Sequence, residues 1–273
     1  MLINQLFSFL ETKLARPRLN WFKTLVFNFR CLPFRQAMKL PIRLYGSWNF
    51  RSLEGRVILD DLEKGGVNIW RIGKNYAGYV TTSTGTLTLM KGSVWVIGQG
   101  VKISQGVHIC LFPNARFEIG KYSTIGDNAK IICSHSIIVG ERCGLTWECQ
   151  LLDYGTHYLQ DINNNEIKNI FQSIEIADCC WIGNRTSVMP GTRLPHDTTV
   201  ASNSLLNKDY IQRSIQPYSL IGGIPAKMIR EGVLRLRDVR NENFLRRHFT
   251  LTHERSISSE ELPIKEYGKE KTN

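Results

Sequence analysis

The sequence predicts a β-solenoid, a chain wound into stacked coils, and its strongest signal is a period of six. An aliphatic residue returns at every sixth position, in four runs, between residues 97 and 206. A period of six fits neither an amphipathic helix nor a single strand. It is typical of hexapeptide repeats, in which each sextet forms one flat face and three faces complete a coil. The runs are Ile97, Ile103, Ile109; Ile119, Ile125, Ile131; Val139, Leu145, Leu151; and Ile176, Ile182, Val188, Leu194, Val200, Leu206.

Two further observations are in register with this period. A small or β-branched residue follows four places after the aliphatic one, where a tight coil has little inward room. A glycine often follows directly, and we expect it to relieve the backbone at sharp corners. The small positions are Val101, Val107, Ser123, Ala129, Cys143, Cys149, Cys180, Thr186, Thr192, Thr198 and Ser204. The glycines are Gly98, Gly120, Gly126, Gly140 and Gly183.

The chain of 273 residues divides into three predicted parts. Residues 1–56 are expected to form a basic helical segment, and residues 57–230 the solenoid, with strict repeats over 97–206. Residues 231–273 are expected to form a charged helix and a polar tail. The repeat is interrupted at 152–175, which predicts a loop that leaves the solenoid surface. Loops held by a rigid scaffold are where functional residues gather.

The positive charge is concentrated at the start of the chain. The formal net charge is +11, and residues 1–56 hold ten Lys or Arg against Glu11 and Glu54. Aromatic residues alternate with these cations. We expect a cap that packs on the first coil with a basic outer face, and the alternative is contact with an anionic membrane surface. Nucleic acid is not an expected partner because no recognised motif accompanies the charge.

The cysteines predict a reducing environment and no metal site. There are seven, an odd number, and most occupy repeat positions where cysteine acts as a compact apolar residue. No paired CxxC arrangement is present, so we expect neither a disulfide framework nor a metal. No apolar run approaches the roughly 18–20 residues of a membrane span, and the N-terminus lacks the pattern of a secretory signal. A cytoplasmic protein is expected.

Two stretches of the chain resemble a known family. They read LTWECQLLDYGTHY at 145–158, and WIGNRTSVMPGTRLPHDTTVASNSLLNKDY followed by IGGIPAKMI between Trp181 and Ile229. This pattern is similar to hexapeptide-repeat acyltransferases, in the maltose/galactoside acetyltransferase-like branch that includes sugar and capsule O-acetyltransferases. The likeness covers residues 97–230 in outline. It implies a left-handed parallel β-helix, a homotrimer, acetyl-CoA as donor substrate, and a carbohydrate acceptor held between adjacent subunits.

The interruption of the repeat holds the candidate general base. His157 lies in it, and an imidazole titrating near neutrality suits the removal of a proton from an attacking hydroxyl. Asp153 matches the first acidic residue of the family's Asp-x-Asp-x-His pattern, whereas Gly155 replaces the second. Asp153 is expected to bind the acceptor, to orient the imidazole, or to cap the loop. Glu148 is a further candidate for acceptor binding or for orienting His157.

The resemblance also implies a donor site. Trp181 is expected to line the acyl end, and the small residues Ala201 and Ser202 to leave room for the pantetheine arm. Anionic phosphates require cations where the groove ends. The resemblance assigns Lys208 and Lys227 to the phosphates, and Pro225 and Ala226 to the adenine.

These expectations converge on an acetyl-CoA-dependent O-acetyltransferase that acts on a sugar hydroxyl by direct transfer, with His157 as base. The acceptor is expected to be a surface or capsular polysaccharide or its precursor. Two alternatives stay open: N-acetylation of a nucleotide-linked amino sugar, and a non-catalytic trimeric scaffold. A γ-type carbonic anhydrase is disfavoured because no H-x₄-H pair is present.

Overall fold

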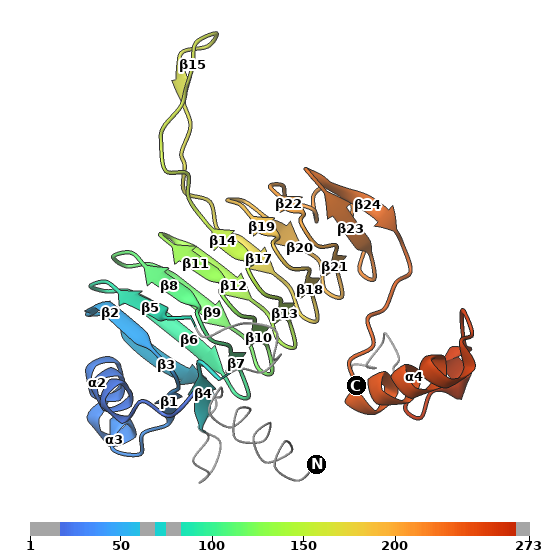
Figure 1. Cartoon of the computed structure of the whole chain (residues 1–273). Coiled ribbons are helices and arrows are strands. Elements are labelled where there is room, and N and C mark those ends of the chain that lie inside the picture. The colour runs from blue at the N-terminus through green and yellow to red at the C-terminus, as the bar shows by residue number, and fades with distance from the viewer. Residues whose placement is uncertain (1–16, 61–68, 75–82, 266–273) are drawn as a thin grey trace, which may run out of the picture.

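The computed structural model describes residues 17–60, 69–74 and 83–265. In these residues the chain forms a left-handed β-helix whose coils stack parallel strands into three faces (Figure 1). The predicted fold class is confirmed. The chain visits the faces in a fixed order, first, second, third, and then climbs to the next coil. Each face of the triangular section therefore meets the next at an edge where the backbone turns.

The described strands are assigned to faces as follows. The first face contains β1 (Ile42–Leu44), β4 (Trp70–Ile72), β7 (Lys102–Ile103), β10 (Thr124–Ile125), β13 (Gly144–Leu145), β18 (Trp181–Ile182), β21 (Thr199–Val200), β23 (Leu220–Gly223) and β24 (Ala226–Arg230). The second contains β2 (Trp48–Leu53), β5 (Gly85–Leu89), β8 (His108–Leu111), β11 (Lys130–Cys133), β14 (Gln150–Leu152), β19 (Ser187–Val188) and β22 (Leu205–Leu206). The third contains β3 (Arg56–Asp60), β6 (Val94–Gly98), β9 (Arg116–Ile119), β12 (Ser136–Val139), β17 (Ile174–Ile176) and β20 (Arg193–Leu194).

The core follows the six-residue period. Every aliphatic residue of the four runs is at most 1% exposed, and every small residue four places later is at most 4% exposed. The strands pair in register, so that Ile103, Ile125 and Leu145 lie above one another on the first face. Buried apolar area is the main favourable term in folding, and here it is continuous along the helix axis.

The glycines serve a different purpose from the one predicted. The left-handed residues at the edge between the first and second faces include Asn128, Glu148 and Arg185, with φ of 57°, 58° and 58°. Gly120 and Gly183 do not adopt a positive φ. A Cβ on Gly183 would lie 2.5 Å from the backbone nitrogen of Ser202, in the next coil. Glycine is required here because successive coils approach closely, and the corner itself accepts residues with side chains.

Residues 1–16 of the predicted N-terminal helical segment lie outside the described residues, and the described part, 17–56, is helical over only some of its length. Helices α2 (Trp21–Cys31) and α3 (Phe34–Ala37) are followed by β1 and β2, which already belong to the β-helix. The solenoid therefore begins before residue 57, where the sequence analysis placed its start. Helix α2 caps the open edge of β1 with side chains. Asn28 donates to the carbonyl of Ile42 at 2.7 Å and accepts from its N–H at 3.2 Å.

The interruption at 152–175 forms an arm that projects from the β-helix (Figure 1). It leaves between β14 on the second face and β17 on the third, and contains a small antiparallel hairpin of β15 (Gln160–Asp161) and β16 (Glu166–Ile167). Beyond β24 the chain crosses to helix α4 (Val239–Thr252) and the 3₁₀ turn η1 (Ser259–Glu261). Among the described residues, no helix combines the length and the apolar character that a membrane span requires.

Candidate active site

Trp181 lies on the first face, at the start of β18. Its ring covers Gly144 of the neighbouring strand β13, since a Cβ at Gly144 would lie 2.5 Å from Cε3 of the indole. The guanidinium carbon of Arg235 is 3.8 Å from the centroid of the Trp181 ring, a cation–π contact. The segment between β24 and α4 therefore packs against this face.

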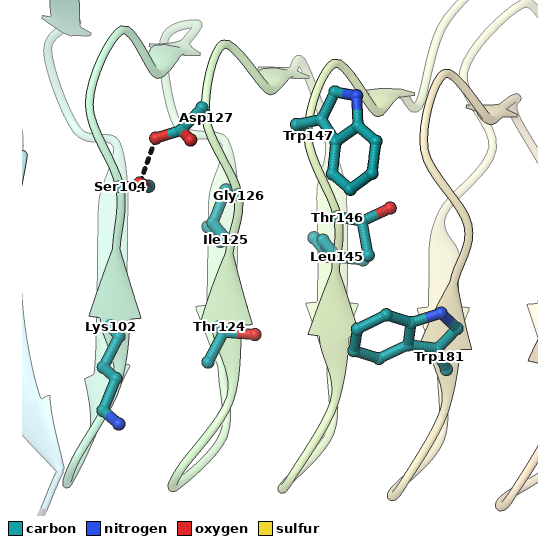
Figure 2. A pocket seen from close by; sticks show the side chains of 10 residues that line it. All are labelled: Lys102, Ser104, Thr124, Ile125, Gly126, Asp127, Leu145, Thr146, Trp147 and Trp181. Atoms are coloured by element: carbon teal, nitrogen blue, oxygen red, sulfur yellow. Dashed lines mark hydrogen bonds between the residues drawn. The ribbon is translucent and has the colours of Figure 1, made fainter. Parts of the chain in front are cut away.

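A cavity of about 460 Å³ opens beside Trp181 (Figure 2). Its lining comes from successive strands of the first face and from the turns that follow them. The lining residues are Lys102, Ser104, Thr124, Ile125, Gly126, Asp127, Leu145, Thr146, Trp147 and Trp181. Two indole rings and the carboxylate of Asp127 thus share one cavity.

His157 lies on the projecting arm, well apart from this cavity in the fold. The arm departs from the edge between the second and third faces, whereas Trp181 belongs to the first face. The side chain of His157 is exposed, and among the described residues its imidazole has no hydrogen-bond or ion-pair partner. One chain alone does not bring His157 to Trp181.

The stem of the arm is well packed. Tyr154 stacks on Phe171 with ring centroids 6.1 Å apart and meets Phe112 edge-on at 5.5 Å. The N–H of Gly155 donates to the carbonyl of Ile170 at 3.0 Å, joining the two sides of the stem. His157 therefore follows a well-packed stem, and its own side chain points outward from the arm.

The carboxylate of Asp153 already accepts hydrogen bonds from the backbone where the arm leaves the β-helix. Asp153 is fully buried, and its two carboxylate oxygens accept the backbone N–H groups of Ser134 and His135, both at 2.7 Å. The thiol of Cys133 lies 3.3 Å from the same carboxylate, and burial, followed by this neighbouring charge, raises the pKa of that thiol. Of the three roles considered for Asp153, these contacts favour capping of the loop.

Glu148 also lies apart from His157. It is exposed at the edge between the first and second faces, in the turn between β13 and β14. Its carboxylate pairs with Nε of Arg185, one coil further, at 2.6 Å. The ion pair raises the pKa of Arg185 through a hydrogen bond and the opposite charge.

Most of the predicted donor-site residues lie near one another, beyond Trp181 along the helix axis. Ala201 and Ser202 form the turn after β21, which pairs with β18, and the Ser202 hydroxyl donates to Oδ1 of Asn184 at 2.6 Å. Strand β23 follows β21 on the first face, and the hairpin of β23 and β24 contains Pro225, Ala226 and Lys227. Ala226 is buried and Lys227 is exposed.

Lys208 does not join this group. It follows β22 on the second face, and its carbonyl accepts the N–H of Arg193, on the third face, at 3.4 Å. Lys208 therefore lies at a different edge from Ala201 and Lys227. The described residues contain no cluster of three or more His, Cys, Asp or Glu side chains that could hold a metal ion.

Sequence reasoning missed four residues of this region: Ser104, Asp127, Trp147 and Arg235. Asp127 and Trp147 each stand two places after a core residue, Ile125 and Leu145, on neighbouring strands of the first face. That shared phase of the repeat was the available signal, because it places them on adjacent turns. No periodic signal pointed to Arg235, which reaches Trp181 from outside the solenoid.

Comparisons with known proteins agree with the resemblance seen in the sequence. Chloramphenicol acetyltransferase from Klebsiella aerogenes is 39% identical over 56 residues, which is 20% of this chain and 24% of that protein. The enzyme of the same name from Escherichia coli matches over the same extent with the same identity. The chain therefore spans about a quarter of the length of these relatives. No family model matches the chain.

Solved structures of acetyltransferases are also similar to it. The polySia-specific acetyltransferase NeuO covers 78% of this chain, with 15% identity and a TM-score of 0.48. The match covers 99% of the NeuO chain. The hexapeptide-repeat acetyltransferase VCA0836 from Vibrio cholerae, solved with acetyl coenzyme A, covers 54% of this chain and 72% of its own, with 20% identity and a TM-score of 0.36. At identities of 15% and 20%, these are likenesses of fold.

Proposed function

We propose that the protein is an acyltransferase that moves an acetyl group from acetyl-CoA to a sugar hydroxyl, with His157 as general base. The observation that carries this proposal is the exposed imidazole of His157, which has no hydrogen-bond partner among the described residues and lies on an arm with a packed stem. The identity to chloramphenicol acetyltransferases over 56 residues supports acyl transfer. The expected acceptor is a surface or capsular polysaccharide or its precursor.

The arrangement of the faces favours a site shared between copies. His157 would meet Trp181 when the arm of one copy reaches the first face of a neighbour. Repetition of this contact around a closed ring makes a symmetric oligomer. The resemblance implies a homotrimer, so we propose three such shared sites.

In the proposed reaction His157 accepts the proton of the acceptor hydroxyl as its oxygen attacks the thioester carbonyl carbon. A new C–O bond forms, the C–S bond breaks, and the imidazolium returns its proton to the departing thiolate. The products are an acetyl ester and coenzyme A. A positioned general base typically contributes about 10²–10⁴-fold to such a step.

The donor is proposed to lie along the turns that follow β18 and β21. Trp181 would contact the acyl end, the small residues Ala201 and Ser202 would leave room for the pantetheine arm, and Pro225 and Ala226 would contact the adenine. Lys227 is the better placed cation for the phosphates, because it lies on the same face as Trp181. Lys208 would take part only if the donor also reached the second face.

The test measures thiol release from acetyl-CoA across a panel of sugars and glycan repeat units. His157→Ala is expected to abolish acceptor-dependent turnover, and the control His253→Ala, in the C-terminal region, is expected to keep it. Turnover that survives His157→Ala would remove this residue as the base. Failure of the wild type both to turn over and to bind coenzyme A would favour the non-catalytic scaffold.

Mixed oligomers test whether the site is shared. His157→Ala and Trp181→Ala are each expected to lose activity. In a randomly mixed trimer roughly a quarter of the shared sites regain both native side chains. Restored turnover on mixing, after unfolding and refolding together, supports the shared site. No restoration would place the whole site within one chain.

We also propose that the N-terminal cap contacts an anionic membrane surface. Three exposed aromatic residues of the cap, Trp21, Phe22 and Phe34, are 58%, 69% and 71% exposed. Residues 17–53 contain seven Lys or Arg and no acidic residue. Exposed aromatic side chains with surrounding cations match the chemistry of an anionic lipid interface.

The membrane proposal is tested by co-sedimentation with vesicles of phosphatidylcholine alone or mixed with phosphatidylglycerol. The wild type is expected to bind the anionic vesicles, and the double variant Trp21→Ser/Phe22→Ser to lose that binding. Leu251→Ser, an exposed apolar residue on α4, is the matched control. Equal binding by the wild type and the double variant would contradict the proposal.

A further inference from the structure

Asp127 is a buried carboxylate to which the described residues offer few hydrogen-bond donors. The residue is 1% exposed and Ser104 is 3% exposed. Within the described residues, the Ser104 hydroxyl is the hydrogen-bond partner of the Asp127 side chain. That hydroxyl also lies 3.3 Å from the carbonyl of Lys74, and a hydroxyl has a single hydrogen to donate. An ionised carboxylate can accept about four hydrogen bonds, so Asp127 retains unused acceptor capacity.

Burial of a charge without donors is costly. The described residues offer the Ser104 hydroxyl, so a ligand in the cavity could supply further donors to the carboxylate. Asp127 lines that cavity together with Trp147 and Trp181 (Figure 2). A ligand that fits must therefore offer hydroxyl or N–H donors to the carboxylate and an apolar surface to the indole rings. The like charge of Asp127 disfavours phosphates at this position.

A pyranose ring meets both requirements. Its hydroxyl groups donate hydrogen bonds, and its C–H faces pack on aromatic rings. A volume of about 460 Å³ lies in the range of small-molecule sites and exceeds what one sugar ring needs. A Cβ at Gly144 would lie 2.5 Å from Cε3 of Trp181, so the absence of a side chain there allows the indole ring to lie beside the cavity.

We propose that this cavity binds a pyranose ring of the acceptor, with Asp127 accepting hydrogen bonds from its hydroxyls and Trp147 packing on its face. This inference rests on the proposed function and adds to it the acceptor subsite. Trp181 stands at the boundary, between the cavity on one side and the turns proposed for the donor on the other. Acceptor and donor would then meet at Trp181, where His157 of a neighbouring copy is expected.

The experiment compares saturation-transfer NMR binding of methyl α-glucoside, methyl α-galactoside, methyl N-acetyl-α-glucosaminide and methyl α-sialoside to the full-length protein. Asp127→Asn keeps the shape of the side chain and removes its charge. Trp147→Leu removes the aromatic face. A hydrogen bond to a charged group is worth enough that Asp127→Asn is expected to weaken glycoside binding at least about tenfold. Asp60→Asn, an exposed carboxyl on the third face, is the control.

The inference is supported if at least one glycoside binds the wild type and the Asp60→Asn control, and binds both cavity variants at least tenfold more weakly. Coenzyme A binding, measured by calorimetry, must stay unchanged in the same variants. The inference is overturned if no glycoside binds the wild type, or if Asp127→Asn and Trp147→Leu bind as the wild type does. Thermal melting of each variant identifies a loss of binding that arises from unfolding, and Trp147→Leu is the decisive variant if Asp127→Asn is unfolded.

Thiol-release assays on the same variants separate this inference from the proposed function. Acetyl transfer to a sugar with an unchanged acceptor KM in both cavity variants would overturn the subsite and leave the function standing. Glycoside binding that depends on Asp127 and Trp147, without any acetyl transfer, would leave the subsite standing and overturn the function.

Discussion

Replacement of Asp153 by alanine tests whether this residue holds the arm or contacts the substrate. The side chain is fully buried, and its oxygens accept two backbone N–H groups at 2.7 Å. Removal of the carboxylate leaves the N–H groups of Ser134 and His135 without these acceptors. A hydrogen bond to a charged group contributes about 1.5–3 kcal/mol to stability. Asp153→Ala should therefore lower the free energy of unfolding by about 3 kcal/mol or more.

This effect is large compared with the usual stability of a domain, about 5–15 kcal/mol. Urea unfolding followed by circular dichroism measures it, with Asp161→Ala on the exposed hairpin as control. Asp153→Asn should cause a smaller loss, because the amide oxygen still accepts one N–H while its NH₂ group faces the other. The folded fraction of either variant should keep the acceptor KM of the wild type. A loss below about 1 kcal/mol in Asp153→Ala, together with a raised acceptor KM, would refute the capping role and return Asp153 to the substrate.

Three further outcomes follow from the contacts described above. Gly144→Val should displace the Trp181 ring, since a Cβ there would lie 2.5 Å from the indole, and should raise the KM for acetyl-CoA and change the tryptophan fluorescence. Asn28→Ala should lower the free energy of unfolding by about 1–3 kcal/mol, because the N–H and carbonyl of Ile42 lose their partner at the edge of β1; urea unfolding that matches the wild type would contradict this. Burial, followed by nearby basic side chains, lowers the pKa of His108 in the folded protein from its ordinary value of 6.5. As the pH falls below 6.5, the unfolded chain therefore binds more protons at this residue than the folded chain does, and stability decreases. His108→Gln should remove part of that acid-side loss, which melting temperatures between pH 4.5 and pH 8 would show as a shallower slope, roughly over the range where histidine titrates.

The sequence by itself determined the β-helix. Each coil repeats the same contacts with its neighbours. The aliphatic residue at every sixth position and the small residue four places later therefore identify the buried positions of every coil. Ile125 and Leu145 are predicted to be buried from their phase alone, and both are 1% exposed. The interruption that holds His157 was visible for the same reason, since a loop that leaves a regular repeat breaks its period.

The glycines and the first coil show the limit of that reasoning. The period placed Gly183 directly after an aliphatic position, as observed. Glycine is required there because Ser202 of the next coil approaches closely, a contact that exists only when the coils are stacked. Near the N-terminus the repeat is irregular, and β1 and β2 pair with later strands without a six-residue signal. The helix α2 completes that end because the side chain of Asn28 satisfies backbone groups of an edge strand.

Only the tertiary structure decided which polar residues share a site. Asp153 and His157 are four residues apart in the chain, yet the carboxylate turns into the core and the imidazole out to solvent. Asp127, Trp147 and Trp181 come from three different coils and line one cavity because their strands stack in register. The physical reason is that the period of the sequence predicts only whether a side chain faces inward or outward. A site depends on which outward side chains meet across coils and on what packs against them, as Arg235 packs on Trp181.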